Sequence, residues 1–167
     1  MADVSLRPIS MDDLPLYEGM LTDPRMMTEL GGPLASDGLA DKLAGIVRDV
    51  ERDDAWFFVI VADGRDVGTV CVWDADDDWG SAPEIGWMVR SEEQGHGYAS
   101  AAVAEVLRRA REQDRWDEIH SHPGVSNGPS NAICRKAGFE KLGERDIPYM
   151  DRTLRCAHWR IDVASAS

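Results

Sequence analysis

The sequence predicts one α+β domain that spans residues 1–167 and contains a sheet with at least one pair of parallel strands. A short apolar run at 84–89 precedes a loop with two glycines, an amphipathic helix at 98–113 and a further strand at 118–122. A strand, helix and strand of this length form a right-handed crossover between parallel strands. No internal repeat or linker interrupts the chain, and 167 residues suffice for one domain with its own core.

The first fifty residues are expected to form one strand and two amphipathic helices. The strand covers 5–9, and Ser10 is a suitable N-cap because its hydroxyl can accept a hydrogen bond from the first turn. Segment 30–33 is expected to be a loop, and Ser36 caps the second helix. Apolar residues repeat at helical spacing at Leu14, Tyr17 and Leu21 and then at Leu39, Leu43, Ile46, Val47 and Val50. Both helices are expected to cover one side of the sheet and to wall a substrate cleft.

Two strands are expected in the middle of the chain. The apolar run 56–62 is typical of a strand buried on both faces, and a turn at 63–65 leads into a second strand at 67–73. The acidic segment 74–80 has alternating aspartates, as a calcium loop does. Its sixth position is Trp79 instead of glycine and its twelfth is Ile85 instead of glutamate, so we expect a solvated hairpin loop.

The C-terminal part is expected to hold a short helix and two closing strands. Asn127 and Pro129 suit the start of the helix, and Gly138 suits its end because glycine readily adopts the left-handed conformation found there. The closing strands are expected at 140–144 and 153–163, joined through 146–149.

Composition limits the classes of function. The net charge of −13 argues against binding to nucleic acid or to an anionic membrane, while an acidic surface attracts cationic substrates such as amines. The three cysteines form no C-x-x-C pair and no even disulfide set, which indicates a reducing compartment. The N-terminus lacks the features of a signal peptide, and no apolar run approaches the ~20 residues that span a membrane. We therefore expect a cytoplasmic protein with no membrane or nucleic-acid partner.

The loop Gln94-Gly95-His96-Gly97 carries the main functional signal. Glycines let backbone N–H groups point at one spot, and the following helix adds the positive end of its dipole, so the loop predicts a cradle for an anion such as phosphate. It is not a P-loop, because no G-K-[ST] follows the glycines. The dinucleotide fingerprint G-x-G-x-x-G matches only in part, since Ser100 replaces the third glycine and His122 ends the next strand where an acidic residue belongs.

Two motifs together resemble the GNAT superfamily of N-acetyltransferases. One is the strand, Q/R-x-x-G-x-G/A loop and helix start at 84–99, and the other is segment 127–139, which ends in Lys136-Ala137-Gly138-Phe139. The order of elements agrees over essentially the whole chain. The resemblance implies a mixed, largely antiparallel central sheet whose central parallel pair is splayed into a V, flanked by about four helices. Segment 22–33 with Gly97-Tyr98-Ala99 resembles the Rim-type, ribosomal-protein-alanine acetyltransferase-like subgroup, which acetylates protein N-termini and has relatives that take small amines.

The resemblance implies acetyl-CoA as co-substrate, bound in the V, and no metal. The strand backbone at Met88 and Val89 would orient the pantetheine arm and the thioester, while Asn127 and Ser130 would line the arm. Arg90 and loop N–H groups would meet the arm and the pyrophosphate; the loop residues are Gln94, Gly95, His96, Gly97, Tyr98 and Ala99. If Gly95 and Gly97 are the final pair of the motif, its first position is Glu92, a departure from the family. If Gly97 and Ala99 are that pair, the first position is Gln94. Family spacing favours the first register.

The implied reaction is direct attack of a primary amine, on a small molecule or a protein N-terminus, on the thioester. An ammonium group cannot attack, so a base or a water chain must remove a proton. Glu84, which begins the opening strand, is the first candidate base, and His122 is the second. The family usually protonates the leaving thiolate with a tyrosine at the position that is Cys134 here. Cys134 or Ser130 therefore donates instead, or no protein acid is needed.

Two other functions stay open at this point. A non-catalytic CoA-binding sensor or scaffold would explain the missing tyrosine, and a small-molecule oxidoreductase would use the glycine loop for a dinucleotide. His120 and His122 share a strand face, but the sequence has no third residue at a spacing typical of metal ligands. We therefore expect these histidines to be polar residues lining the cleft and expect no metal site. The sequence leaves the acceptor amine open and is compatible with a monomer or a homodimer.

Overall fold

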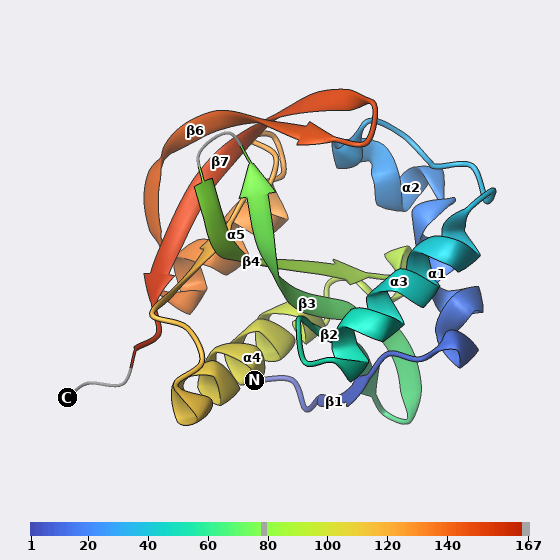
Figure 1. The fold of residues 1–167 in the computed structure, drawn as a ribbon, viewed down its shortest axis with the longest axis horizontal. Helices are drawn as coiled ribbons and strands as arrows, with labels where there is room; N and C mark the ends of the chain where they lie inside the picture. The colour runs from blue at the N-terminus through green and yellow to red at the C-terminus, as the bar shows by residue number, and fades with distance from the viewer. Residues whose placement is uncertain (78–79, 165–167) are drawn as a thin grey trace.

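A mixed β-sheet forms the centre of the molecule (Figure 1). The computed structural model describes residues 1–77 and 80–164. Within these residues seven strands lie in the order β1-β2-β3-β4-β5-β7-β6. Their bounds are Ser5–Pro8 (β1), Trp56–Ala62 (β2), Arg65–Asp77 (β3), Gly80–Val89 (β4), Glu118–Ser121 (β5), Glu140–Tyr149 (β6) and Arg152–Asp162 (β7).

The direction of the strands confirms the predicted fold class. β4 and β5 are parallel and are connected through helix α4, Tyr98–Gln113, as the strand, helix and strand pattern requires. All other neighbouring strands in the described sheet are antiparallel. The protein is thus an α+β fold with a mixed, largely antiparallel sheet.

Helices cover both faces of the sheet. On one face, α4 and α5 (Gly128–Ala137) pack in an apolar cluster with β-strand residues such as Ile60 and Ile119. On the other face, α1 (Leu14–Leu21) and α3 (Leu39–Glu51) pack in a second cluster that includes Val59. Since successive residues of a strand point to opposite faces, Val59 and Ile60 show that β2 is buried on both, as predicted.

The segment predicted as a break and a loop contains additional helical turns. Helix α2, Pro24–Met27, and the 3₁₀ turn η2, Thr28–Leu30, precede Gly31. Asp23 caps α2 by accepting a hydrogen bond from the Arg25 N–H at 2.8 Å, and Pro24 occupies the first turn, where its missing N–H costs nothing. The described residues therefore hold five α-helices instead of about four, with further 3₁₀ turns at Met11–Asp13 (η1) and Ser91–Glu93 (η3).

Three strands are longer than the sequence predicts. β4 begins at Gly80, so the prediction that Glu84 begins this strand is wrong, and Glu84 lies within it. β3 continues to Asp77, so the prediction of a hairpin loop over 74–80 is wrong for 74–77. Asp74 and Asp76 stay exposed while the backbone pairs with Pro83 and Ser81 of β4, because alternation lets charged side chains remain in water. Residues 78 and 79 lie outside the described residues. β6 likewise runs to Tyr149, since it pairs with β7 along its whole length.

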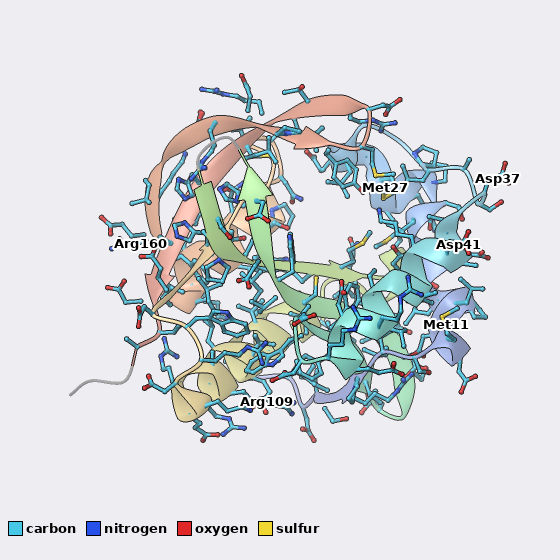
Figure 2. All side chains as sticks on the ribbon, viewed as in Figure 1. Met11, Met27, Asp37, Asp41, Arg109 and Arg160 are labelled. Carbon is cyan, nitrogen blue, oxygen red and sulfur yellow. The ribbon has the colours of Figure 1, made fainter. Side chains whose placement is uncertain are left out.

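Charged side chains surround the apolar interior (Figure 2). Asp37 and Asp41 project outward at the start of α3, and Arg160 of β7 lies at the opposite edge of the molecule in this view. Met27 of α2 is fully buried in the second cluster. None of the helices in the described ranges is both long enough and apolar enough to cross a membrane.

Candidate functional site

β4 and β5 meet at one point and then separate. Their parallel pairing consists of one register pair, Glu84 with His120. From Ile85 to Val89, β4 keeps only its antiparallel partner β3 within the described sheet. The V that the family resemblance implies is present, and the edge of β4 that faces into it carries backbone groups with no strand partner. Such groups need hydrogen-bond partners, which a ligand can supply.

A loop with two left-handed glycines joins β4 to α4. Gly95 and Gly97 have φ angles of 80° and 79°, which other residues adopt at a cost of roughly 1–2 kcal/mol. The first turn of α4 closes with a bond from the Ala101 N–H to the Gly97 carbonyl at 3.1 Å. N–H groups earlier in the helix, such as that of Ala99, have no intrahelical acceptor and suit an anion.

Two arginines lie close to Glu92, just before the glycine loop, and offset the negative charge of its carboxylate. Arg90 Nη2 lies 2.6 Å from Glu92 Oε1, and Arg25 Nη2 lies 4.0 Å from Glu92 Oε2. The Gln94 side chain turns back, and its Nε2 donates to the Val89 carbonyl at 2.9 Å. Arg25 belongs to α2, a helix that the sequence did not predict. For that reason nothing in the sequence indicated that Arg25 lies beside the loop.

The positions of residues with left-handed backbone conformation help to choose between the two possible registers of the glycine motif. They are Gly95 and Gly97, whereas Ala99 lies inside α4. This geometry favours Gly95 and Gly97 as the final pair of the motif, with Glu92 in its first position.

Close backbone packing holds the end of β4. A Cβ atom on Gly68 of β3 would stand 2.1 Å from the Met88 carbonyl oxygen, so only glycine fits there. One residue beyond the strand, the Arg90 N–H donates to the Val67 carbonyl at 2.9 Å. Met88 and Val89, the residues expected to orient the thioester, are thereby fixed against β3.

Helix α5 positions the candidate acids. Asn127 Oδ1 accepts a hydrogen bond from the Ser130 N–H at 3.2 Å and so caps the helix. Ser130 is half-buried in the first turn, whereas Cys134, one turn further, is 0% exposed and belongs to the apolar cluster beneath α4. Burial raises the pKa of the Cys134 thiol to about 11, against the opposing effect of a hydrogen bond with Ser121. Cys134 is thus protonated at neutral pH but enclosed by the core.

Glu84 lies next to His122 where β4 and β5 meet. The distance from His122 Nδ1 to Glu84 Oε1 is 3.3 Å, and the two side chains are 6% and 16% exposed. Both ring nitrogens of His122 are buried, and neither has a hydrogen-bond partner in the described part of the chain. The two candidate bases are therefore neighbours.

His122 is one of three histidines that stack on one another, with His158 and His120. The ring of His122 lies on that of His158 with centroids 4.7 Å apart and planes 17° apart. His158 Nε2 is 2.7 Å from His120 Nδ1, and His120 Nε2 is 2.9 Å from Glu118 Oε1. His158 comes from β7, so only the pairing of β7 with β5 brings it here, and no local pattern could have revealed it. Among the described residues, no set of three or more histidine, cysteine, aspartate or glutamate side chains is arranged to hold a metal ion.

Distant segments meet on the face covered by α1 and α3. Arg152 Nη1 of β7 donates to the Leu30 carbonyl at 2.9 Å, and its side chain passes so close to Gly31 that a Cβ there would stand 2.6 Å away. Ser126 Oγ donates to Glu29 Oε2 at 2.7 Å. Figure 1 shows the β6–β7 hairpin arching toward α2. The hairpin and the N-terminal helices thus border the same side of the V.

An acidic cavity of about 450 Å³ opens near the end of α3. Trp73 of β3 lies in its wall and is the register partner of Glu84. Arg115 lies 2.5 Å from Asp53 and offsets one of the carboxylates. The complete lining is Asp49, Asp53, Asp54, Ala55, Trp73, Asp74 and Arg115. With four aspartates against one arginine, the cavity favours a cation.

A family model described as an acetyltransferase (GNAT) domain matches residues 3–140. A comparison with curated protein sequences gives no match.

Solved structures with the same fold include several acetyltransferases. Ribosomal L7/L12 α-N-protein acetyltransferase RimL in complex with coenzyme A has a TM-score of 0.81 and 17% identity, over 97% of this chain and 95% of that one. Aminoglycoside acetyltransferase AAC(6')-Ib in complex with coenzyme A has a TM-score of 0.77 and 16% identity, over 96% and 95%. Mycobacterium smegmatis RimJ in complex with CoA-disulfide has a TM-score of 0.78 and 21% identity, over 96% and 82%. At these identities the likeness establishes the fold.

Proposed function

The chain belongs to the GNAT acetyltransferase family, and from that premise we propose that it moves the acetyl group of acetyl-CoA directly to a primary amine. The observation that carries the proposal is the position of the glycine loop at the end of the open edge of β4. A ligand with phosphates at the loop extends its other end into the V, beside Glu84. Acetyl-CoA has this form, with a pyrophosphate at one end and a thioester at the other.

The residues around the V fit this co-substrate. The pyrophosphate is held by Arg90 and by backbone N–H groups of the loop and first turn of α4, from Gln94, Gly95, His96, Gly97, Tyr98 and Ala99. The backbone of Met88 and Val89 and the side chains of Asn127 and Ser130 line the pantetheine arm. When bound, acetyl-CoA supplies a thioester whose carbonyl carbon accepts the nucleophile.

Glu84 acts as the base in this proposal. It takes a proton from the acceptor ammonium, directly or through water, and leaves a neutral amine that can form the new C–N bond. The C–S bond breaks, and the sulfur takes a proton from Ser130 in the first turn of α5 or from Cys134 one turn further. The residue that donates regains a proton from the newly acylated nitrogen, which loses its second proton as it becomes an amide. Ser130 is the more accessible of the two, because Cys134 is enclosed in the core.

The acceptor is proposed to be a cationic amine. The net charge of −13 and the acidic cavity beside Trp73 support this, because both attract positive charge. Aminoglycosides and ribosomal-protein N-termini, the acceptors named for two of the similar structures, are of this kind. We assign the chain to the Rim-type subgroup on its loop and helix motifs, and place it in the cytoplasm, where its free cysteines stay reduced.

An acetylation screen over polyamines, aminoglycosides and peptides with basic N-termini, read as release of free CoA, tests the proposal. Glu84→Gln is expected to lower kcat by about 10²–10⁴-fold while the Kd for acetyl-CoA stays unchanged, because the variant removes a proton acceptor and no cofactor contact. Glu140→Gln, at an exposed strand position, is the control and keeps full activity. If calorimetry detects no binding of acetyl-CoA, the proposal is wrong.

A non-catalytic CoA-binding module is the second candidate, favoured by the burial of Cys134 where the family usually places a tyrosine. It predicts tight CoA binding, no acetylation of any amine in the screen, and no effect of Glu84→Gln or Cys134→Ala. Loss of transfer in Ser130→Ala or Cys134→Ala with unchanged CoA binding argues for the enzyme.

A further inference from the structure

His122 is a buried polar side chain that the structure leaves unsatisfied. Its side chain is 6% exposed, and both ring nitrogens lack a hydrogen-bond partner within the described residues. A buried imidazole without partners is unfavourable, and such groups in native proteins call for an explanation. The structure offers one, because a carboxylate oxygen, Glu84 Oε1, stands 3.3 Å from Nδ1.

The two side chains differ in their access to solvent. Glu84 is 16% exposed and His122 is 6% exposed, so the carboxylate lies nearer the solvent and the imidazole lies behind it. A proton taken from an acceptor therefore reaches Glu84 first. The titratable and charged groups around the pair are Cys71 on β3, Glu118 and His120 on β5, Cys156 and His158 on β7, and Arg145 on β6.

We propose that His122 acts through Glu84 as the residue that holds the proton removed from the acceptor amine, so that Glu84 and His122 work as one base. The inference rests on the proposed function. The proton passes from the acceptor ammonium to a Glu84 oxygen and then to His122 Nδ1, a transfer that uses the tautomer with its hydrogen on Nε2. The result is an imidazolium beside a carboxylate that is ionised again.

Basicity gives this arrangement its advantage. Imidazoles are ordinarily about two pKa units more basic than glutamate carboxylates, so a histidine holds a proton at neutral pH more readily than a carboxylate does. The restored carboxylate at 3.3 Å stabilises the imidazolium by opposite charge. After the products leave, the proton returns through Glu84 to water.

Kinetics over pH test the role of His122. In the unchanged protein, kcat/KM is expected to fall on the acid side as the joint base becomes protonated. In His122→Asn this acid-side fall is expected to shift to lower pH, because imidazoles are ordinarily more basic than carboxylates, and kcat at pH 7 is expected to fall about tenfold or more. His120→Asn removes a ring of the same stack whose nitrogens contact His158 and Glu118 instead of the Glu84 carboxylate, and this variant is expected to keep the acid-side fall of the unchanged protein.

A double variant tests whether the two residues act as one unit. If they do, Glu84→Gln/His122→Asn is no slower than Glu84→Gln alone, because the second change removes nothing further. A His122→Asn profile identical to that of the unchanged protein, or losses that multiply in the double variant, would overturn the inference and leave the acetyltransferase proposal standing. No transfer by the unchanged protein would overturn both.

A measurement without turnover covers the case in which His122→Asn does not fold. The NMR signals of the ring nitrogens of the four histidines are compared at neutral pH between the unchanged protein and Glu84→Gln. Loss of the carboxylate 3.3 Å from Nδ1 is expected to move the signals of His122, with a smaller change at His120. Identical histidine signals in the two proteins would contradict the proposed coupling.

Discussion

The two sides of the V present different kinds of chemical group to a ligand. On the cofactor side, the loop at 94–97 and the edge of β4 offer mainly backbone groups, held in place by glycines at 68, 95 and 97. The acceptor side offers side chains instead: Glu84 of β4, His122 just after the end of β5, and Arg152 of β7. A backbone site depends on φ and on close approach, whereas a side-chain site depends on register between distant segments. The backbone site therefore tolerates changes in neighbouring side chains. In the side-chain site, substitutions can change which acceptor amine binds.

A glycine substitution tests the cofactor side and is expected to have a larger effect than changes at Arg152 or Asp13. Gly95→Ala introduces a Cβ at φ 80° where the phosphates are proposed to bind, and we expect the Kd for acetyl-CoA to rise about a hundredfold. Gly64→Ala is the matched control, because Gly64 has φ 72°, has no atom within 4 Å of the added Cβ, and lies in the β2–β3 turn.

Calorimetry with acetyl-CoA separates the two glycine variants. Both are expected to lose about 1 kcal/mol of stability, since the strain of the left-handed conformation is the same. Equal binding by both variants would mean that the cradle does not depend on the backbone at Gly95.

Arg152→Ala tests the acceptor side, with a smaller expected effect. Without the hydrogen bond to Leu30, the β6–β7 hairpin loses its tie to the N-terminal segment, and we expect KM for the acceptor to rise about three- to tenfold, less than about 1.4 kcal/mol. KM for acetyl-CoA should not change. Arg155→Ala, which removes an exposed ion pair with Asp146 on the same hairpin, is the control and should leave both values unaltered. A change in KM for acetyl-CoA alone would contradict the division between the two sides.

Asp13→Asn should alter stability and leave binding unchanged. Asp13 is 5% exposed and holds the start of α1 to β1 through Arg7, at 2.7 Å. Burial alone raises the pKa of the Asp13 carboxyl, but hydrogen bonds from the Arg7 guanidinium and the Ser10 N–H outweigh it and hold the pKa below its usual value.

The pH dependence of this effect follows from the lowered pKa. The stabilisation is complete above the unfolded pKa of about 3.9 and is lost as pH falls through the lower folded value. With Arg7 partly exposed, we expect Asp13→Asn to cost about 1–2 kcal/mol at pH 7, and the gap in Tm to narrow below about pH 4. Asp66→Asn, which removes the other, exposed partner of Arg7, should cost less than about 0.5 kcal/mol. A gap that is the same at pH 7 and pH 3 would show that the ion pair is not its cause.

Local sequence patterns predicted those structural features that depend on residues close together in the chain. The stripe at Leu39 and Leu43 and the glycines before Tyr98 gave the helices, because helix periodicity and left-handed positions are properties of short segments. They failed at 74–77, where a composition typical of a loop continues as strand because β4 supplies the backbone partners. The short helix α2 was also missed, although Asp23-Pro24 is a recognisable start signal.

The sequence by itself determined the family, the fold class, the glycine loop and Glu84 as a candidate base. The fold class and the loop follow from spacing along the chain, which sets backbone conformation, while the family and the role of Glu84 follow from the resemblance of two motifs to known acetyltransferases. Only the tertiary structure decided that His122 lies 3.3 Å from Glu84 under His158, that Cys134 is sealed in the core, and that Arg152 reaches Leu30. These contacts depend on the register of β7 against β5 and on how far β4 and β5 separate, and no stretch of sequence encodes either alone.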